Sequence, residues 1–420
     1  MTGGEQANIV LIHGSRCALG PTTSDRCSLH IGAGRIRRLI PEAQSVRTLS
    51  PHGDTIDLTG FLLLPGLVNA HDHLEFSLFP RLAAPPYANY IEWGEDIHAR
   101  FAEQIALHRA VPKNLRALWG AIRNLLSGVT TVAHHNPLRP EMTAADFPVR
   151  VMHPYGWAHS VALGGDLHAA RASTPAGAPF ILHAGEGTDA RARQELWDLD
   201  QRGLLDASAV LVHGLALDAR ATALLIERHS SLIVCPSSNR FLFDALPDLS
   251  LLSSIPNLTL GNDSPLTAEG DLLDELRFAL RFSGVLPQQA WSMVTSGPAQ
   301  ILRLRRGEGT LQPGGVADLI AVRDTGGDPA DALARLIPQD VELVMIGGRV
   351  QLASETMLPR IPPAMRRGLE CLRVDDEMRW VRAPVAQLVE QTEQVLGRGQ
   401  VRLGTRPVTV DAKARCSHAG

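Results

Sequence analysis

The sequence predicts an α/β fold: a (β/α)8-type TIM barrel, distorted in one part, with a small composite β-sandwich domain from both chain ends. Two observations carry this prediction. Between residues 66 and 307, short apolar runs alternate with amphipathic segments of helical spacing, a pattern typical of parallel strands covered by helices. On either side of this region, short β segments predominate and are separated by Gly, Pro, Ser and Asp.

The two ends of the chain are predicted to share one domain. The first 65 residues contain candidate strands at 8–13, 27–31, 35–40 and 55–58, and β segments return at 309–311, 318–322 and 341–346. We therefore expect a composite β-sandwich from residues 1–65 and 308–364. Residues 365–420 are expected to form a C-terminal extension with one helix, at 383–396.

The barrel is assigned to residues 66–307. Seven apolar runs are its candidate strands, at 62–68, 129–133, 149–152, 180–182, 209–212, 232–234 and 258–260. Helical spacing is clear at 113–127, 189–204, 218–229 and 270–283. The stretch 137–179 should hold two βα units and is short for two, so the distortion is expected there.

Composition excludes several classes of protein. The 420 residues are 45% hydrophobic and 20% charged, which is typical of a globular chain with a sizeable core. A net charge of −4 argues against a nucleic-acid partner, and we see neither a signal peptide nor an apolar run long enough for a membrane span. Five scattered cysteines without a CxxC pair fit a cytoplasmic location. A small-molecule partner is expected, and a homodimer is left open.

Polar residues follow most of the predicted barrel strands. His71 and His73 flank Asp72 after the first run, and His183, His213 and Asp263 follow later runs. In a parallel barrel these strand ends lie at one rim. Strand alternation points His71 and His73 the same way and Asp72 the other way. A lone HxH or a lone histidine is commonly structural, but the repeated position after strands favours a metal site, because imidazole and carboxylate are ligands for Zn²⁺, Fe²⁺ and Mn²⁺.

Five motifs resemble a known family. They are PGLVNAHDH at 65–73, HAGE at 183–186, VHG at 212–214, CPSSN at 235–239 and GNDSP at 261–265. With them, the sequence resembles the amidohydrolase superfamily over about residues 8–350. Within that superfamily it is similar to the aminohydrolase branch, which includes adenosine, cytosine, guanine and S-adenosylhomocysteine deaminases and the triazine hydrolases.

The resemblance implies a mononuclear metal-dependent hydrolase. His71, His73, His183 and Asp263 would hold one divalent ion, with Zn²⁺ expected and Fe²⁺ or Mn²⁺ as alternatives. The catalytic residues would be Glu186 as acid and base, His213 to position the attacking water, and Asp263 to accept its proton. A bridging carboxylated lysine is disfavoured, since the two lysines are Lys113, before the second strand, and Lys413, in the tail.

The implied reaction is hydrolytic deamination of a small purine, pyrimidine, pterin or triazine-like heterocycle by metal-bound hydroxide, with release of ammonia. A first alternative is an amidase, cyclic-amide hydrolase or C–halogen hydrolase on the same scaffold. A second is a non-catalytic metal-bearing binding protein. The presence of acid and base residues beside the ligands argues against the second, because ligands alone would suffice to hold a metal.

Four residues are candidates for substrate contact. His135 ends the second strand, His153 follows the third, Trp93 belongs to an aromatic segment after the HxH motif, and Asn239 lies in the loop after a later strand. For each, a structural role stays open: a supporting histidine, core packing, or a plain hydrophobic patch.

Overall fold

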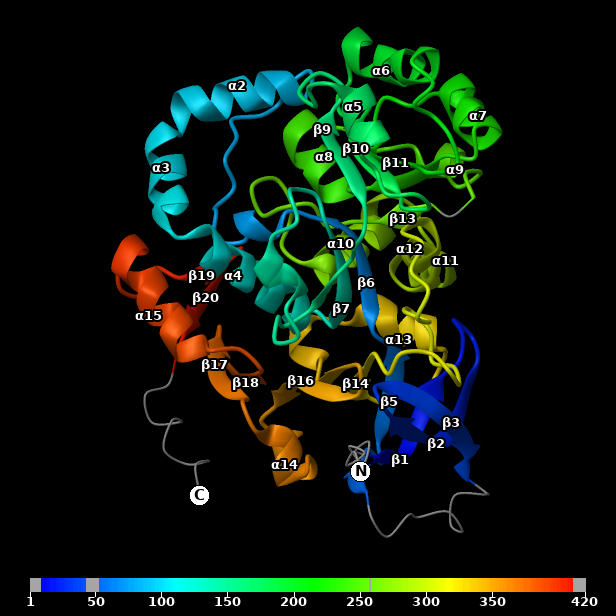
Figure 1. Cartoon of the computed structure of the whole chain (residues 1–420), viewed down its shortest axis with the longest axis vertical. Helices are drawn as coiled ribbons and strands as arrows, with labels where there is room; N and C mark the ends of the chain where they lie inside the picture. The colour runs from blue at the N-terminus through cyan, green and yellow to red at the C-terminus, as the bar shows by residue number, and fades with distance from the viewer. Residues whose placement is uncertain (1–8, 43–52, 257, 411–420) are drawn as a thin grey trace, which may run out of the picture.

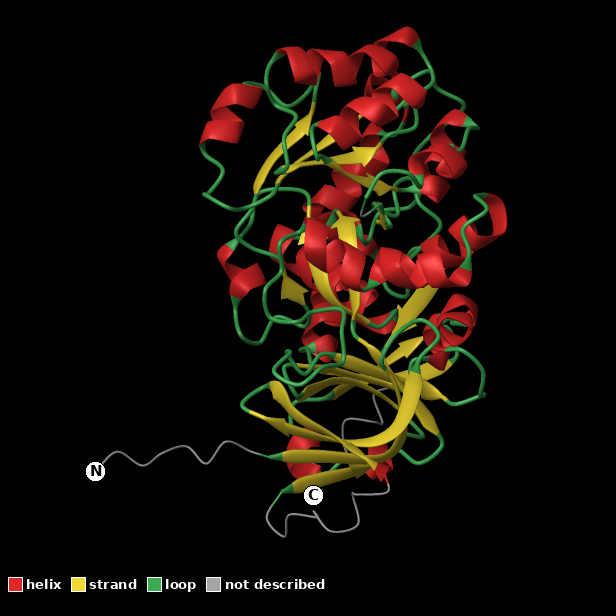
Figure 2. Ribbon diagram, turned by 90° about the vertical axis from the view of Figure 1, so that its right-hand side faces the viewer, coloured by secondary structure: helices red, strands yellow, loops and turns green. Residues whose placement is uncertain are grey.

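The computed structural model describes residues 9–42, 53–256 and 258–410. A large sheet occupies one end of this part of the protein, and helices with parallel strands make up the rest (Figures 1 and 2). Among the described helices, none combines the length and apolar composition that crossing a bilayer requires.

The large sheet joins both ends of the chain. Its order over the described residues is β19-β20-β17-β18-β16-β15-β14-β5-β1-β2-β3, with β4 paired to β1. The N-terminal strands are β1 (Val10–Ala18), β2 (Ser24–Gly32), β3 (Arg35–Pro41), β4 (Asp54–Asp57) and β5 (Phe61–Pro65). The later strands are β14 (Leu319–Arg323), β15 (Leu343–Ile346), β16 (Arg349–Ser354), β17 (Glu370–Val374), β18 (Glu377–Val381), β19 (Arg402–Leu403) and β20 (Arg406–Thr409). Its packing as a sandwich and the predicted domain boundaries stay predictions.

The C-terminal region is more than a helical extension. The predicted helix is present as α15 (Val385–Leu396), but strands β17 to β20 also extend the large sheet. Thr392 on α15 accepts a hydrogen bond of 2.8 Å from Trp119 Nε1 on α4 (Lys113–Leu126), which attaches this region to the parallel-strand part. The strand predicted at 309–311 is absent, because Gly307 and Gly309 turn the chain with φ of 86° and 73°.

The parallel strands form two hydrogen-bonded ladders. One has the order β6-β7-β8 and the other β13-β12-β11-β10-β9. Their bounds are β6 (Leu67–Asp72), β7 (Val129–His134), β8 (Arg150–Val151), β9 (Gly156–Ser160), β10 (Phe180–Ala184), β11 (Ala209–His213), β12 (Ser231–Val234) and β13 (Thr259–Leu260). This is a TIM-barrel-like α/β arrangement around a parallel sheet.

The expected closed ring of eight βα units is wrong. Only residues 152–155 separate β8 from β9, which is too few for a crossover between parallel strands of one sheet. Instead, β8 pairs with β7 and β9 pairs with β10. The segment 150–160 therefore fills one place in the strand order, and its two short strands belong to different ladders. At the other junction, β13 and β6 meet through one bridge, between Asp72 and Asp263. The middle of the barrel thus contains one strand position where two were expected.

The helices of the barrel follow the predicted spacing. Aspartates cap several of them: Asp166, Asp189, Asp218 and Asp271 accept backbone N–H groups at the starts of α5, α6, α7 and α10. Besides α4, the barrel helices are η1 (Leu74–Phe76), α2 (Tyr90–Arg100), α3 (Ala102–Ala110), η2 (Pro140–Thr143), α5 (Leu167–Ala172), α6 (Ala190–Gln201), α7 (Ala219–Glu227), α8 (Pro236–Phe243), α9 (Leu249–Leu252), α10 (Leu272–Phe282), α11 (Pro287–Val294) and α12 (Ser296–Ile301). The others are α13 (Pro329–Arg335), η3 (Pro338–Asp340), η4 (Leu358–Arg360) and α14 (Pro363–Arg366).

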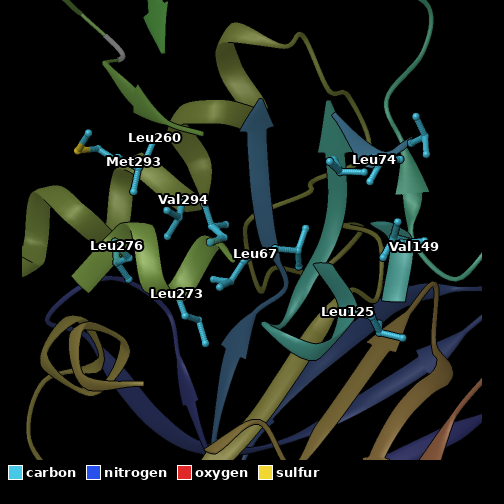
Figure 3. Packing of buried hydrophobic residues seen from close by; sticks show 14 of the residues in the cluster. Leu67, Leu74, Leu125, Val149, Leu260, Leu273, Leu276, Met293 and Val294 are labelled. Atoms are coloured by element: carbon cyan, nitrogen blue, oxygen red, sulfur yellow. The ribbon is translucent and has the colours of Figure 1, made fainter. Parts of the chain in front are cut away.

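The core holds the strand ends in place. Leu125, Leu273 and Leu276 of the helices belong to the same buried cluster as Leu67 and Leu260 of the strands (Figure 3). A separate cluster joins the inward faces of the strands, with members that include Val68, Ala133, Ile181, Val210 and Ile233. This apolar filling supports the polar residues at the carboxyl ends of the strands.

Candidate metal centre and active site

Five side chains from four strands and the residues directly after them converge at one rim. His71 lies in β6, His73 follows it, His183 lies in β10, His213 ends β11, and Asp263 follows β13. The ligand atoms of His71, His73 and Asp263 lie within 4.8 Å of one another, and so do those of His71, His183 and His213. Of the four predicted ligands, all therefore come together, with His213 beside them.

The distances define a compact donor set. The Nε2 atoms of His71 and His183 are 3.2 Å apart. Asp263 Oδ1 lies 3.8 Å from His71 Nε2 and 3.6 Å from His73 Nε2. All of these residues are at least nine-tenths buried.

The charge states fit a divalent cation. Burial, with the neighbouring histidines, lowers the pKa of His73 and His183 well below the usual range, so their imidazoles are neutral with free lone pairs. Burial opposes ionisation of Asp263, but the interactions with His71, His213 and His73 outweigh it and hold its pKa low. Imidazole nitrogens and one carboxylate form a suitable ligand set for Zn²⁺ and related ions.

Backbone conformation supports this convergence. His213 and Asp263 have φ of 80° and 54°, the left-handed region that residues other than glycine seldom adopt. Such conformations concentrate at functional sites, because surrounding structure must stabilise them. Gly261 is required for close approach: a Cβ atom there would lie 2.5 Å from His71 Cβ.

Asp263 is held by several donors. The Ser238 hydroxyl donates to Oδ2 at 2.8 Å, the Thr267 hydroxyl donates to the same atom at 3.2 Å, and the Ser264 N–H donates to Oδ1 at 2.8 Å. These hydrogen bonds favour the ionised carboxylate and fix its direction.

Glu186 lies beside this donor set in a nearly dry environment. Its Oε2 is 3.5 Å from His213 Nε2, and the residue is 6% exposed. Burial, together with the carboxylates of Asp263 and Glu195, raises the pKa of Glu186 well above its usual value. This environment favours the protonated form of the carboxyl group, which can donate a proton.

The loop of Glu186 is braced by α6 and α2. Glu195 Oε2 accepts the Gly185 N–H at 2.8 Å, and Glu195 Oε1 accepts the Tyr90 hydroxyl at 2.7 Å. The Tyr90 N–H donates to Glu186 O at 3.2 Å. Burial raises the pKa of Glu195 to about 7.

The orientation of the His213 ring is set by a contact of its Nδ1 atom. The Asn239 amide nitrogen lies 3.2 Å from His213 Nδ1, which directs Nε2 toward Glu186. Burial lowers the pKa of His213 to about 4, so the ring is neutral. Asn239 thus contacts a site histidine and does not line the pocket, although the sequence suggested a substrate contact.

Asp72 points away from the donor set, as strand alternation predicts. Its carboxylate is fully buried and contacts Arg123 Nη2 at 2.6 Å and Asn124 Nδ2 at 2.5 Å, both on α4. Arg123 also donates to Gly270 O and lies 3.5 Å from Asp263 O. One guanidinium therefore connects the HxH segment with the segment that carries Asp263.

The other three residues predicted to contact substrate, Trp93, His135 and His153, lie at different places relative to the pocket. Trp93 lines the pocket above the donor set. His135 lies behind that set: its ring centroid is 4.2 Å from that of His183, and Nε2 contacts Ala158 O at 3.0 Å. His153 lies elsewhere, in a separate hollow lined also by Pro179 and residues 302–306, so the structure does not bring it to the site. Because Pro179 precedes β10, that hollow is at the opposite ends of the strands.

The pocket over the donor set has a volume of about 710 Å³. Its floor contains His73, His159, His183, Glu186, His213 and Asp263. Its walls are largely apolar and come from the loop after β6, from α2 and α3, and from the loops after β9 and β13. In Figure 1, α2 and α3 form an arch at the side of the barrel.

The positions of the two lysines bear on whether the site could hold two metal ions bridged by a lysine. Lys113 pairs with Glu75 at 2.9 Å and does not line the pocket. Lys413 lies outside the described residues. Within the described chain, no lysine is placed to bridge two ions at this site.

Tyr90, Glu195, Arg123 and Ser238 support the site but are not predicted from the sequence. For Glu195 and Arg123, the helix pattern in the sequence contains an indication of this role. Glu195 alternates with Ala192, Leu196 and Leu199 on the buried face of α6, and Arg123 occupies the buried face of α4. A charged residue on an apolar helix face needs a partner, and here the partner lies beside the site.

Comparisons with known proteins agree with this geometry. The family model described as amidohydrolase family matches residues 158–351. A 5-methylthioadenosine/S-adenosylhomocysteine deaminase of Natronomonas pharaonis is 26% identical over 330 residues, covering 64% of this chain and 74% of the relative. A protein of the same name from Moorella thermoacetica is 27% identical over 361 residues, covering 71% and 83%.

Solved structures share the fold. An adenosine deaminase from Xanthomonas campestris with bound zinc matches with a TM-score of 0.66 at 19% identity, covering 92% of this chain and 97% of the other. Atrazine chlorohydrolase from Arthrobacter aurescens TC1, complexed with zinc, matches with a TM-score of 0.69 at 18% identity, covering 92% and 99%. The chain is thus similar to the amidohydrolase family over residues 158–351, and the two solved structures share its fold.

Proposed function

We propose that this protein is a metal-dependent hydrolase that deaminates a small nitrogen heterocycle. The observation that supports the proposal is the position of Glu186, a buried carboxyl group with a raised pKa, next to a converged His, His, His and Asp donor set under one pocket. The relatives named as deaminases support the same reaction class. We further propose Zn²⁺ as the ion, a single metal per chain, and a cytoplasmic location.

The metal's ligands would be His71, His73, His183 and Asp263. When bound, a divalent ion supplies Lewis acidity that makes water a nucleophile near neutral pH. His213 would hold the attacking water through Nε2, and Asp263 would accept its proton. Both roles fit the neutral imidazole and the ionised carboxylate described above.

Glu186 would act as the proton donor to the ring. The water oxygen adds to the carbon that carries the exocyclic amine, and Glu186 protonates the adjacent ring nitrogen. The C–N bond to the amine then breaks. Ammonia leaves with the proton that Asp263 took from the water, and the remaining hydroxyl proton returns to Glu186 as the carbonyl forms. The raised pKa of Glu186 suits this role, because a general acid must hold its proton at the working pH.

The test is ammonia release by the metal-loaded protein across aminated purines, pyrimidines, pterins and triazines. Glu186→Gln should keep the metal content, measured by mass spectrometry, and lower turnover by about 100-fold or more. Glu103→Gln on α3, an exposed residue outside the pocket, is the matched control and should keep full activity. Undiminished turnover in Glu186→Gln would refute the mechanism. Release of halide, or of a carboxylate without ammonia, would favour C–halogen or amide hydrolysis instead.

A further inference from the structure

The pocket extends well beyond the donor set. Its volume of about 710 Å³ lies within the range of about 300–1,000 Å³ that buries drug-sized ligands. The reacting ring would occupy only the floor, near Glu186 and His213. The space above, which we name the outer chamber, is lined by Phe76, Phe79, Trp93, Ile97, Leu163 and Leu266.

The outer chamber adjoins a separate apolar cluster. Phe79, Ile97 and Leu266 belong to a cluster distinct from the main core, and Trp93 packs against it. Leu163 remains 53% exposed at the chamber wall. Leu163, together with the partly buried Phe76 and Trp93, leaves apolar surface open to the pocket, which indicates an apolar ligand group that covers it.

Three polar groups beside the apolar side chains of the outer chamber already have partners within the protein. Trp93 Nε1 donates to Leu82 O at 2.9 Å. The Tyr90 hydroxyl donates to Glu195 and accepts the Ala162 N–H at 3.0 Å. The Thr267 hydroxyl donates to Asp263. A sugar placed against these apolar side chains would bury hydroxyls that Trp93, Tyr90 and Thr267 do not pair with, which carries a penalty that an alkyl group avoids.

The mouth does not favour one sign of charge. The ionisable side chains there are Glu95 and His98 on α2 and Arg109 on α3, which are one carboxylate, one imidazole and one guanidinium. The selection therefore comes from the apolar wall.

We propose, resting on the deaminase function above, that the substrate is an aminated heterocycle whose ring carries a sizeable apolar substituent, seated in the outer chamber in place of a free sugar. The heterocycle lies on the floor against Glu186, and the substituent contacts Trp93 and Leu163. This sets the substrate class apart from free bases and from ordinary ribonucleosides.

The experiment compares substituents on a constant ring. Aminopurine, aminopyrimidine and aminotriazine rings each carry hydrogen, methyl, propyl, pentyl, ribosyl, or an alkyl group of the same size as ribosyl. Up to the chamber's limit, kcat/KM for ammonia release should rise about four-fold per methylene, which corresponds to about 0.8 kcal/mol. The size-matched alkyl compound should exceed the ribosyl compound.

Binding gives a second readout that does not depend on turnover. Calorimetry on metal-loaded Glu186→Gln should give a Kd that falls with chain length and an increasingly negative heat-capacity change. Leu163→Asp should abolish this dependence, whereas Leu286→Asp, at a residue 60% exposed outside the pocket, should retain it.

The outcomes separate the two proposals. A Kd that does not vary with chain length, or tighter binding of the ribosyl compound, overturns the outer-chamber assignment even if ammonia is released. A chain-length-dependent Kd without ammonia from any compound supports the chamber and refutes the deaminase function.

Discussion

Replacing Arg123 by Met should destabilise both the fold and the metal site. Arg123 is 3% exposed and pairs at 2.6 Å with Asp72, which is fully buried between His71 and His73. Removing one partner of a buried ion pair leaves the other charge without compensation and costs about 3–5 kcal/mol. Asp72→Asn should cost a similar amount, since it leaves the guanidinium without its anion.

The double variant Asp72→Asn/Arg123→Met isolates the pair. Because it removes both charges, its loss of unfolding free energy should fall short of the sum of the single losses by about 2 kcal/mol or more. Urea denaturation of the four proteins measures this. Arg100→Met is the control: Arg100 pairs with Asp96 on α2 but is 63% exposed, so its loss should stay under about 1 kcal/mol.

Metal affinity is the second readout for Arg123. Its guanidinium connects the HxH segment to the Asp263 segment, so its loss should weaken metal binding by about 10–100-fold, the effect expected of groups that orient ligands. The reasoning is refuted if the single losses add within about 0.5 kcal/mol in the double variant and metal affinity is unchanged.

Three further outcomes are expected. The pKa of Glu195, raised to about 7, means that the folded protein holds a proton there that the unfolded chain loses above pH 4.5. The stability that this proton contributes is thus complete below pH 4.5 and is lost as pH rises through 7. Between pH 5 and 8, the free energy of unfolding of the parent protein should therefore fall by about 3 kcal/mol more than that of Glu195→Gln. An equal dependence on pH in the two proteins would contradict this. Chelation of the metal should lower the melting temperature, with re-addition at about 1,000 times Kd restoring about 4 kcal/mol, and an unchanged melting curve would argue against a metal site. Arg406→Met should cost on the order of 2 kcal/mol of unfolding free energy, because Arg406 contacts Asp271 at 2.6 Å and Asp274 at 3.0 Å, while a cost near zero would show that the C-terminal strands do not brace α10.

Local sequence patterns determined the position of the site along the chain. Strand alternation separates His71 and His73 from Asp72, and the apolar runs before His183, His213 and Asp263 put each residue at a strand end. The aspartates before α6, α7 and α10 likewise mark the starts of their helices. These features depend on a few neighbouring residues and on a repeating unit, so they can be read without knowledge of distant contacts.

The tertiary structure decided what depends on distant parts of the chain. The pairing of β8 with β7 and of β9 with β10 gives one bent segment in place of two units, and it leaves His153 away from the pocket. The partners of buried charges also lie far apart in sequence: Glu195 meets Tyr90 across 105 residues, and Arg406 meets Asp271 across 135. A buried charge on an amphipathic helix shows that a partner is needed, but only the folded chain identifies it, because that choice is made by packing between elements.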